Sequence, residues 1–521
     1  MITSASAKPV PFSLPASKAA QRRQWLVFFS IILLTLLARL PFIHFIDDDE
    51  AFYSLVAQRW LQGAWPYAES FDVKPPLLFA IFTAAQSLFG ASLATIKGLE
   101  IVFTIWGAVA LQKLIERRGA YNVSLWAGGL FPLLSLAQAG TNSANALLLS
   151  PFIISAFSAM SEAAGGTHRP SRQIFLAGLW IGLAGMVKQT ALFEAVGLVG
   201  FALWYFRHRR PVQVLLLFSA GAALPVLSFG LFFAAAGHFR DAFRAVVIGA
   251  VTRGGLKISI ADDSGLFWIV HFILLISPLA ILLMAAMVAV ARREVIGRTF
   301  PRPLFWLTVI WVVSAAVGCI AGQSALRYYG SNLIAPLLIL SGACILSVAP
   351  AKAWPRTVAI AGATLATLAC VVFVERQGLG LGRQAPGDDY SAARVTAAEL
   401  ERLGYSTSDS LLVPDRGLYV YLETGTVPRG RYFHPMHLTC DFPTPERSPL
   451  VSALAARPRF VVMSDPFRHL NCENPRYRAL LDATLKADYR LAGVATGRWS
   501  RSLIYEIRPV STNRHPDQHA Q

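Results

Sequence analysis

Apolar runs separated by short polar segments fill the chain up to residue 374. A helix needs about 20 predominantly apolar residues to cross the hydrocarbon core of a bilayer, and these runs approach or exceed that length. The predicted spans are 25–45, 93–115, 123–139, 146–160, 174–187, 192–206, 212–236, 266–291, 304–321, 333–348 and 357–374. The pattern therefore predicts an α-helical polytopic membrane protein with about 11 transmembrane helices.

Lysine and arginine gather in the N-terminal segment and in the loop after every second predicted span. This bias places the N-terminus and those loops in the cytoplasm. Only 15% of the residues are charged and 55% are hydrophobic, whereas a soluble domain carries about 25% charge. We therefore interpret the net charge of +17 as a topology signal with lipid contacts, and not as nucleic-acid binding. Residues 1–24 are predicted to form a disordered cytoplasmic tail.

The polar part after residue 374 has a different pattern. The segments predicted as strands are 410–414, 459–463 and 503–507, and those predicted as helices are 392–403 and 477–487. Strands that alternate with helices predict a small α/β domain over 375–510, followed by a flexible tail over 511–521. The odd number of predicted spans places this domain outside the cytoplasm.

The five cysteines form no CxxC pair and no cluster with zinc-ligand spacing. Three of them, Cys319, Cys344 and Cys370, lie in apolar runs and are predicted to be small core residues. Cys440 and Cys472 lie in the C-terminal domain. They could form a disulfide there if the domain faces an oxidising compartment.

The loop after the first span, residues 46–90, begins with four consecutive acids at 47–50. The apolar residues that follow at the spacing of one helix face are Phe52, Leu55, Val56 and Trp60. They predict an amphipathic helix that lies in the membrane interface. The run 75–89 is too short to span a bilayer, so it is predicted to be a re-entrant or interfacial helix.

The acids of this loop admit two interpretations. They could be a solvated, charged end that anchors the first span. Alternatively, Asp49 and Glu50 could serve catalysis, since a carboxylate near an apolar wall has a raised pKa and can take a proton from an attacking hydroxyl.

Cations on the predicted outer side form a second candidate set, namely Lys74, Lys188, Arg253 and Arg327. The positive-inside rule does not require basic residues there. Each could be an exposed or snorkelling side chain, or together they could bind a phosphate. Asn142 and Asn145 are turn residues in the simpler interpretation, and Tyr328 and Tyr329 are interface aromatics. Because no Walker, GxSxG or HExxH motif is present, a membrane-carried donor is more plausible than a nucleotide sugar.

Three motifs together resemble a known family. The motifs are D-E-x-x-Y (49–53) with K-P-P-L (74–77), G-L-A-x-x-x-K-Q-T-A (182–191), and R-Y-Y before a proline-containing span (327–336). They resemble the GT-C membrane glycosyltransferases. The nearest groups are the protein O-mannosyltransferase-like enzymes, the lipid A aminoarabinose transferases and the rhizobial lipopolysaccharide galacturonic acid transferases.

The resemblance implies a GT-C transmembrane domain over 25–374 with a catalytic first outer loop. It implies an inverting glycosyltransferase that moves a sugar from a polyprenyl-phosphate donor to a hydroxyl of an extracytoplasmic acceptor. That acceptor would be lipopolysaccharide, lipid A, another glycan or a protein. The implied location is the bacterial inner membrane, with the active site and the C-terminal domain facing the periplasm, and we expect a monomer.

The resemblance also implies roles for single residues. Asp49 would be the base, with Glu50 beside it. The residues implied to hold the donor phosphate are Lys188 and Arg253, with Lys74 and Arg327 near them. The residues implied to contact substrate are Tyr53, Asn145, Tyr328 and Tyr329. Many relatives carry an acid where this chain has Asn145, so no second carboxylate is assigned and a metal stays undetermined.

No cofactor is predicted to be required, because a monophosphate leaving group does not demand a bound metal. The main rival is a flippase or transporter for polyprenyl-linked sugars or lipids. Such a protein would show paired repeats with broken helices at mid-membrane, and the sequence shows none. A third interpretation is a non-catalytic membrane scaffold whose outer domain binds a partner.

Overall fold

The computed structural model describes residues 18–44, 46–118, 121–139, 147–208, 210–252, 279–293, 300–321, 327–348, 391–415, 417–440, 449–465, 474–497 and 501–509. The chain divides into two compact units. The helical unit comprises Met1–Ile43 and Val73–Arg383, and the mixed unit comprises His44–Asp72 and Gln384–Gln521. The first outer loop, predicted to belong as a whole to the transmembrane domain, is thus divided between Asp72 and Val73.

Most predicted spans coincide with a helix of the helical unit. Its helices are α1 (Lys18–Arg39), η1 (Leu40–Phe42), α3 (Pro76–Phe89), α4 (Leu93–Glu116), α5 (Tyr121–Ala139), α7 (Ser150–Ala164), α8 (Pro170–Val187), α9 (Ala191–Tyr205), α10 (Pro211–Ala235), α11 (Phe239–Phe243), the π-helix η2 (Arg244–Gly249), α14 (Ala280–Ala291), α16 (Arg302–Ala321), η4 (Arg327–Gly330) and α17 (Ser331–Val348). The predicted span 357–374 lies outside the described residues. Among the described helices, α4, α10 and α16 are long and apolar enough to cross a membrane.

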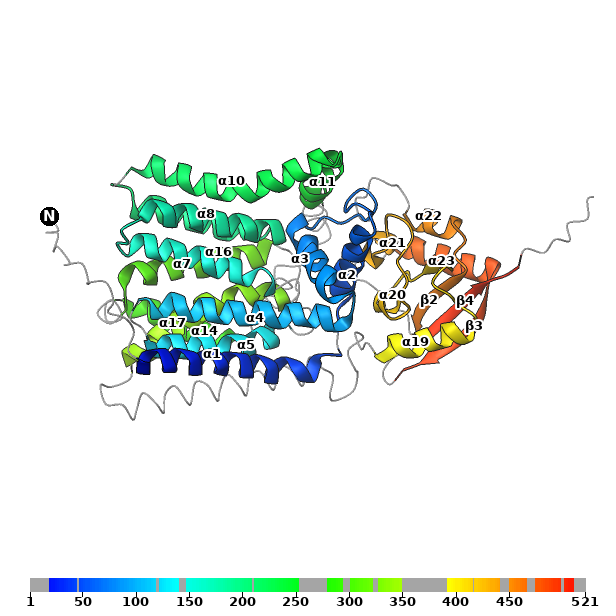
Figure 1. Cartoon of the computed structure of the whole chain (residues 1–521), viewed down its shortest axis with the longest axis horizontal. Helices are drawn as coiled ribbons and strands as arrows, with labels where there is room; N and C mark the ends of the chain where they lie inside the picture. The colour runs from blue at the N-terminus through cyan, green and yellow to red at the C-terminus, as the bar shows by residue number, and fades with distance from the viewer. Residues whose placement is uncertain are drawn as a thin grey trace, which may run out of the picture. The chain divides into compact units, whose positions relative to one another are not determined.

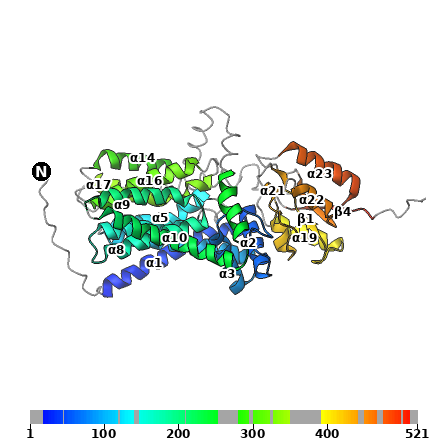
Figure 2. The same cartoon turned by 90° about the horizontal axis from the view of Figure 1, so that it is seen from above.

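The long helices of this unit form two layers (Figures 1 and 2). One layer runs α10–α8–α7–α4–α5–α1, and each helix in it packs on the next. The second layer contains α9, α16, α17 and α14 and packs on the first through α17 with α5 and α16 with α7. The short helix α3, predicted as a non-spanning helix, packs on α4 and α8.

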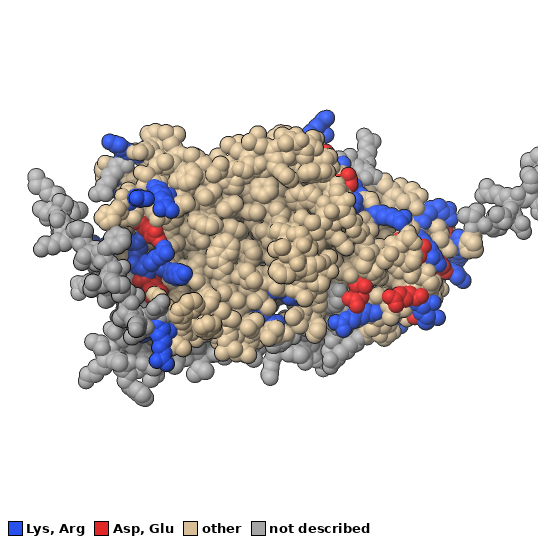
Figure 3. Space-filling view, viewed as in Figure 1, with Lys and Arg blue, Asp and Glu red and all other residues tan. Residues whose placement is uncertain are grey.

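The outer surface of the helical unit suits a bilayer. In Figure 3 its visible face is a broad area without charged residues, and Lys and Arg gather at the end where α8 and α10 begin. Exposed arginines at those helix starts are Arg169, Arg172, Arg207 and Arg210. Large apolar side chains such as Leu216, Leu227 and Leu231 are exposed along α10. Such a contiguous apolar surface is unfavourable in water and favourable against lipid.

Glycines let α8 and α10 approach closely. A Cβ atom added at Gly178 would lie 2.1 Å from the Phe218 carbonyl oxygen, and one at Gly221 would lie 2.1 Å from the Phe175 carbonyl oxygen. Both contacts are with backbone atoms, which cannot move aside as a side chain can. Small residues at such a crossing are what membrane helices use to pack at short range.

We expect Gly178→Ala to destabilise the protein by about 1–3 kcal/mol, because the added methyl group forces the two helices apart. Gly185 lies in the same helix, and a Cβ there would meet nothing within 4 Å. Gly185→Ala should therefore leave the midpoint of thermal unfolding in detergent unchanged or slightly raised. Equal midpoints for the two variants would contradict this packing.

The mixed unit contains the sheet. Its elements are α2 (Asp48–Leu61), α19 (Ser391–Arg402), β1 (Leu411–Leu412), α20 (Tyr419–Glu423), α21 (Pro435–Thr439), α22 (Pro449–Ala455), β2 (Phe460–Asp465), α23 (Pro475–Asp488), β3 (Tyr489–Thr496) and β4 (Arg501–Ile507). The strand order is β1-β2-β4-β3; β1 is parallel to β2, and the other pairs are antiparallel. In the described residues, this unit thus combines a four-stranded sheet with helices. Cys440 is disulfide-bonded, as the sequence allowed, while Cys472 lies outside the described residues.

Candidate active site

The four acids at the start of α2 have separate environments within the mixed unit. The side chain of Asp47 is the N-cap of the helix, and its Oδ1 accepts a hydrogen bond of 2.8 Å from the Asp49 amide. Asp48 Oδ1 accepts from the backbone amides of Gly417 at 2.9 Å and Leu418 at 3.0 Å. Asp47 and Asp48 therefore have structural roles within the mixed unit, which differ from the solvated anchor of the simpler interpretation because Asp48 is buried.

Asp49 has a different kind of partner. Its Oδ1 lies 3.2 Å from Nε2 of His434, and the Asp49 side chain remains 22% exposed. Glu50 and Tyr53, the other predicted site residues of this helix, are completely buried. Asp49 is thus the predicted catalytic acid that keeps an accessible carboxylate.

The prediction that α2 is a one-sided helix in the membrane interface is wrong. All residues from 51 to 57 are buried, so the helix is packed around its circumference. The Phe52 ring lies 4.8 Å from the rings of both Phe433 and His434, measured between centroids. The segment around His434 therefore covers a face of α2 that the sequence pattern leaves to solvent or lipid.

The C-terminal half of α2 and the residues after it are also held by this segment. Arg59 donates to the carbonyl oxygen of Pro428 at 2.8 Å, and also to that of Gly430. Burial lowers the pKa of Arg59, while the Glu69 carboxylate opposes that shift. Arg431 Nη2 donates to the Tyr67 carbonyl at 2.7 Å. Within the mixed unit, these contacts hold the segment from Arg59 to Tyr67 against residues 428–431.

In the helical unit, Lys188 lies in the break between α8 and α9. It is the C-cap of α8 in an extended conformation, and α9 begins three residues later. The side chain is only 7% exposed, and its Nζ lies 4.0 Å from the centre of the Tyr329 ring. A desolvated ammonium over an aromatic face is a favourable arrangement. Two of the predicted site residues thus meet here.

A buried acid accompanies Lys188. Glu194, in the first turn of α9, is completely buried, and its Oε1 accepts from Asn332 Nδ2 at 3.0 Å. Glu194 also interacts electrostatically with Lys188. Its Oε2 has no hydrogen-bond partner among the residues that the structure describes. An acid of this kind is costly inside a membrane protein and is a sign of function or of charge pairing.

Gln189, the neighbour of Lys188, contacts the segment of Lys74 and the π-helix η2. Its Nε2 donates to the carbonyl oxygens of Val73 at 2.6 Å and Val246 at 3.3 Å. Val73 precedes the half-buried Lys74, and Val246 lies in η2. These hydrogen bonds join the segments of Lys74 and Lys188, and the phosphate-binding role of both lysines stays a prediction.

The remaining predicted residues are placed less fully. Arg253 and Asn145 lie outside the described residues. Arg327 and Tyr328 belong to η4, next to Tyr329, and only their backbone is described.

Sequence reasoning missed an ionic cluster at the ends of α1 and α4. Arg39 forms a salt bridge with Glu100, whose other oxygen lies 3.1 Å from Lys97 Nζ. Arg39 also donates to Ser135 Oγ at 2.8 Å, and all three charged side chains are buried. Ionisable residues inside predicted spans were the available signal.

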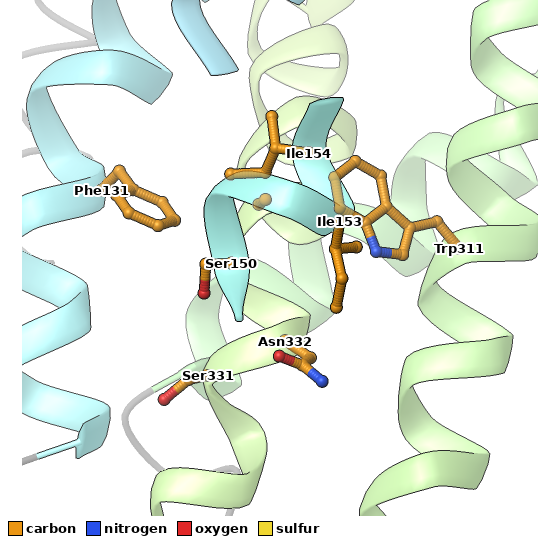
Figure 4. A pocket seen from close by; sticks show the side chains of 8 residues that line it. Phe131, Ser150, Ile153, Ile154, Trp311, Ser331 and Asn332 are labelled. Atoms are coloured by element: carbon orange, nitrogen blue, oxygen red, sulfur yellow. The ribbon is translucent and has the colours of Figure 1, made fainter. Parts of the chain in front are cut away.

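A small cavity lies among helices α5, α7, α16 and α17 (Figure 4). It is lined by Phe131 from α5, by Ser150, Ile153 and Ile154 from α7, by Trp311 from α16, and by Ser331, Asn332 and Ala335 from α17. Asn332, which donates to Glu194, connects the cavity with the buried acid. Nowhere in the described part of the chain do three or more His, Cys, Asp or Glu side chains form a group that could hold a metal ion.

The chain matches several solved structures. It matches ArnT from Cupriavidus metallidurans, in a crystal structure with bound undecaprenyl phosphate, at a TM-score of 0.60 and 14% identity over 94% of this chain and 98% of that chain. The oligosaccharyltransferase of Archaeoglobus fulgidus, in a complex with zinc and sulfate, matches at 0.55 and 14% identity over 84% and 67% of the two chains. AglB from the same organism, in complex with an inhibitory peptide and a dolichol-phosphate, matches at 0.52 and 13% identity over 86% and 70%.

No protein-family model and no curated protein sequence matches the chain. With 13% to 14% of residues identical, what the chain shares with these solved proteins is the fold. The chain therefore shares with ArnT and the archaeal oligosaccharyltransferase a mostly helical membrane-protein fold, as its motifs predict.

Proposed function

We propose that this protein is an inverting glycosyltransferase that moves a sugar from a polyprenyl-phosphate donor to a hydroxyl of an extracytoplasmic acceptor. The observation that carries the proposal is the placement of Asp49. In a chain with a GT-C fold, Asp47 and Asp48 serve backbone amides, whereas Asp49 presents a partly exposed carboxylate on a rigid helix. Such a carboxylate is suited to general-base chemistry.

In the proposed reaction, Asp49 takes the proton of the acceptor hydroxyl. The acceptor oxygen attacks the anomeric carbon from the face opposite the phosphate, and the new C–O bond inverts the configuration. The bond between the anomeric carbon and the phosphate oxygen breaks, and its electron pair stays on the polyprenyl monophosphate. Glu50, in the same helix, is completely buried and is assigned no contact with the acceptor.

Lys188 is the proposed main contact of the donor phosphate, with Lys74, Arg253 and Arg327 as further cations. Two findings support this assignment. The segments of Lys74 and Lys188 are joined through Gln189, and ArnT and AglB, which share the fold, are solved with undecaprenyl phosphate and dolichol-phosphate. Preorganised cations in a water-poor site can contribute roughly 3–4 kcal/mol to stabilising the leaving phosphate.

Other parts of the assignment stay predictions. Tyr329 is a candidate substrate contact because its ring already lies against Lys188. Tyr53, Tyr328 and Asn145 remain predicted substrate contacts. The location in the bacterial inner membrane and the periplasmic orientation also remain predictions. Lipopolysaccharide, or its lipid A part, is the proposed acceptor class.

The test uses full-length purified protein in nanodiscs with radiolabelled short-chain polyprenyl-phosphate sugars and membrane lipid extracts as the acceptor pool. We expect label to move from the donor to an acceptor lipid, and the product to have the opposite anomeric configuration. If no donor is turned over, but labelled lipid crosses the bilayer of protein-containing vesicles, the protein is a flippase and the proposal fails.

A further inference from the structure

The two ring nitrogens of His434 have different partners. The backbone amide of Met436 donates to Nδ1 at 3.1 Å, so Nδ1 is an acceptor. In the neutral ring the proton therefore sits on Nε2, which lies 3.2 Å from Asp49 Oδ1. The hydrogen bond consequently runs from the imidazole N–H to the carboxylate.

This arrangement excludes one otherwise attractive role for His434. In a catalytic pair of acid and histidine, the acid accepts from one ring nitrogen and the other nitrogen takes the substrate proton. Here the other nitrogen, Nδ1, already accepts from the Met436 amide and points into its own backbone turn. His434 therefore cannot act as the base, and that role is left with the carboxylate.

His434 is also held rigidly. It is the N-cap of α21, and its ring packs at 4.8 Å from Phe52 and 5.3 Å from His437. Phe52 lies three residues after Asp49 on α2, so the same face of the helix presents both residues to His434. A side chain with so little freedom can fix the orientation of its hydrogen-bond partner.

The surrounding contacts keep α2 in register with this segment. Asp48 is bound by the amides of Gly417 and Leu418, and Arg59 by the carbonyl oxygens of Pro428 and Gly430. Asp48 and Arg59 lie on either side of the α2 residues that contact His434. The position of Asp49 is therefore set by the C-terminal part of the chain.

We propose that His434 is a positioning residue, whose Nε2–H holds the Asp49 carboxylate in the orientation that takes the acceptor proton. The inference rests on the proposed function, in which Asp49 is the base. It gives the C-terminal domain a part in the chemical step.

Three full-length variants test this role in nanodiscs, with the polyprenyl-phosphate sugar that the wild type uses. His434→Phe keeps a ring but loses the donor, and we expect kcat to fall about ten- to a hundredfold. The KM for the donor and the binding of undecaprenyl phosphate should not change. His434→Gln places an amide N–H near the position of Nε2, so it should recover most of the lost kcat. His437→Phe, on the neighbouring buried ring, should keep the wild-type kcat.

The outcomes separate the two levels of the proposal. An active wild type with an unimpaired His434→Phe would overturn the positioning role alone. Equal losses in all three variants would show that His434 only packs, and would overturn it as well. If His434→Phe does not fold, His434→Gln is compared with His437→Phe. Similar kcat values for the two variants support the positioning role, and a much lower kcat for His434→Gln overturns it. A wild type that turns over no donor would remove the proposed function, and this inference with it.

Discussion

Replacing Asp49 by Asn is expected to abolish sugar transfer, with a fall in kcat of about a hundred- to ten-thousandfold, the range typical of a lost general base. An amide oxygen can still accept the hydrogen bond from His434, and the backbone amide of residue 49 can still donate to Asp47. The helix and its contacts therefore remain. What the variant loses is the ability to take a proton from the acceptor hydroxyl.

The measurement is the initial rate of label transfer in nanodiscs, together with the thermal unfolding midpoint of each variant. Asp48→Asn is the matched control, since its amide oxygen can still accept from both backbone amides and keep α2 in place, and Asp48 has no proposed part in proton transfer. It should lower the unfolding midpoint only slightly and leave kcat close to that of the wild type. Retained turnover in Asp49→Asn would remove Asp49 from the role of base.

The lengths of the apolar runs predicted the long helices well, because a helix that crosses a bilayer needs one long apolar run. The runs at 93–115, 174–187 and 212–236 each became a helix with ends shifted by a few residues. In the C-terminal domain, three strands and two helices were also found from local pattern. The strand β3 was missed because it contains Ala492 and Gly493 and has an irregular register at that point.

The environment of α2 could not be predicted for a different reason. Its apolar stripe was visible in the sequence, but the residues between, such as Ala51, Tyr53 and Ser54, do not mark a buried face. Their burial depends on a segment more than three hundred residues later in the chain, which provides Phe433 and His434. Nothing in the local sequence of either segment indicates that partner.

For the candidate site, the sequence supplied candidate residues but not the contacts between them. Topology placed Lys74 and Lys188 on one side, and that was enough to expect convergence. The contact that joins their segments is made by Gln189, an uncharged residue without a distinctive pattern. Glu194 and Glu100 did leave a signal, because each is an acid inside a predicted span.

The second large effect is expected for Lys188→Met, which should weaken binding of undecaprenyl phosphate about ten- to a hundredfold. A charge-assisted hydrogen bond contributes about 1.5–3 kcal/mol, and each 1.4 kcal/mol is a factor of about ten in the dissociation constant. Transfer should also slow, because the same cation stabilises the charge that grows on the leaving phosphate. Lys113→Met removes an exposed lysine at the end of α4 and should bind the lipid as the wild type does.

Lys188 also interacts electrostatically with the buried Glu194, so loss of binding alone could reflect a damaged fold. The double variant Lys188→Met with Glu194→Gln separates the two effects, because it removes the acid that would otherwise lose its opposite charge. A buried charge left without its partner costs about 3–5 kcal/mol, so the second substitution should restore the unfolding midpoint. If affinity for undecaprenyl phosphate returns with stability, Lys188 serves only to balance Glu194. If stability returns while affinity stays low, the ammonium group itself binds the phosphate.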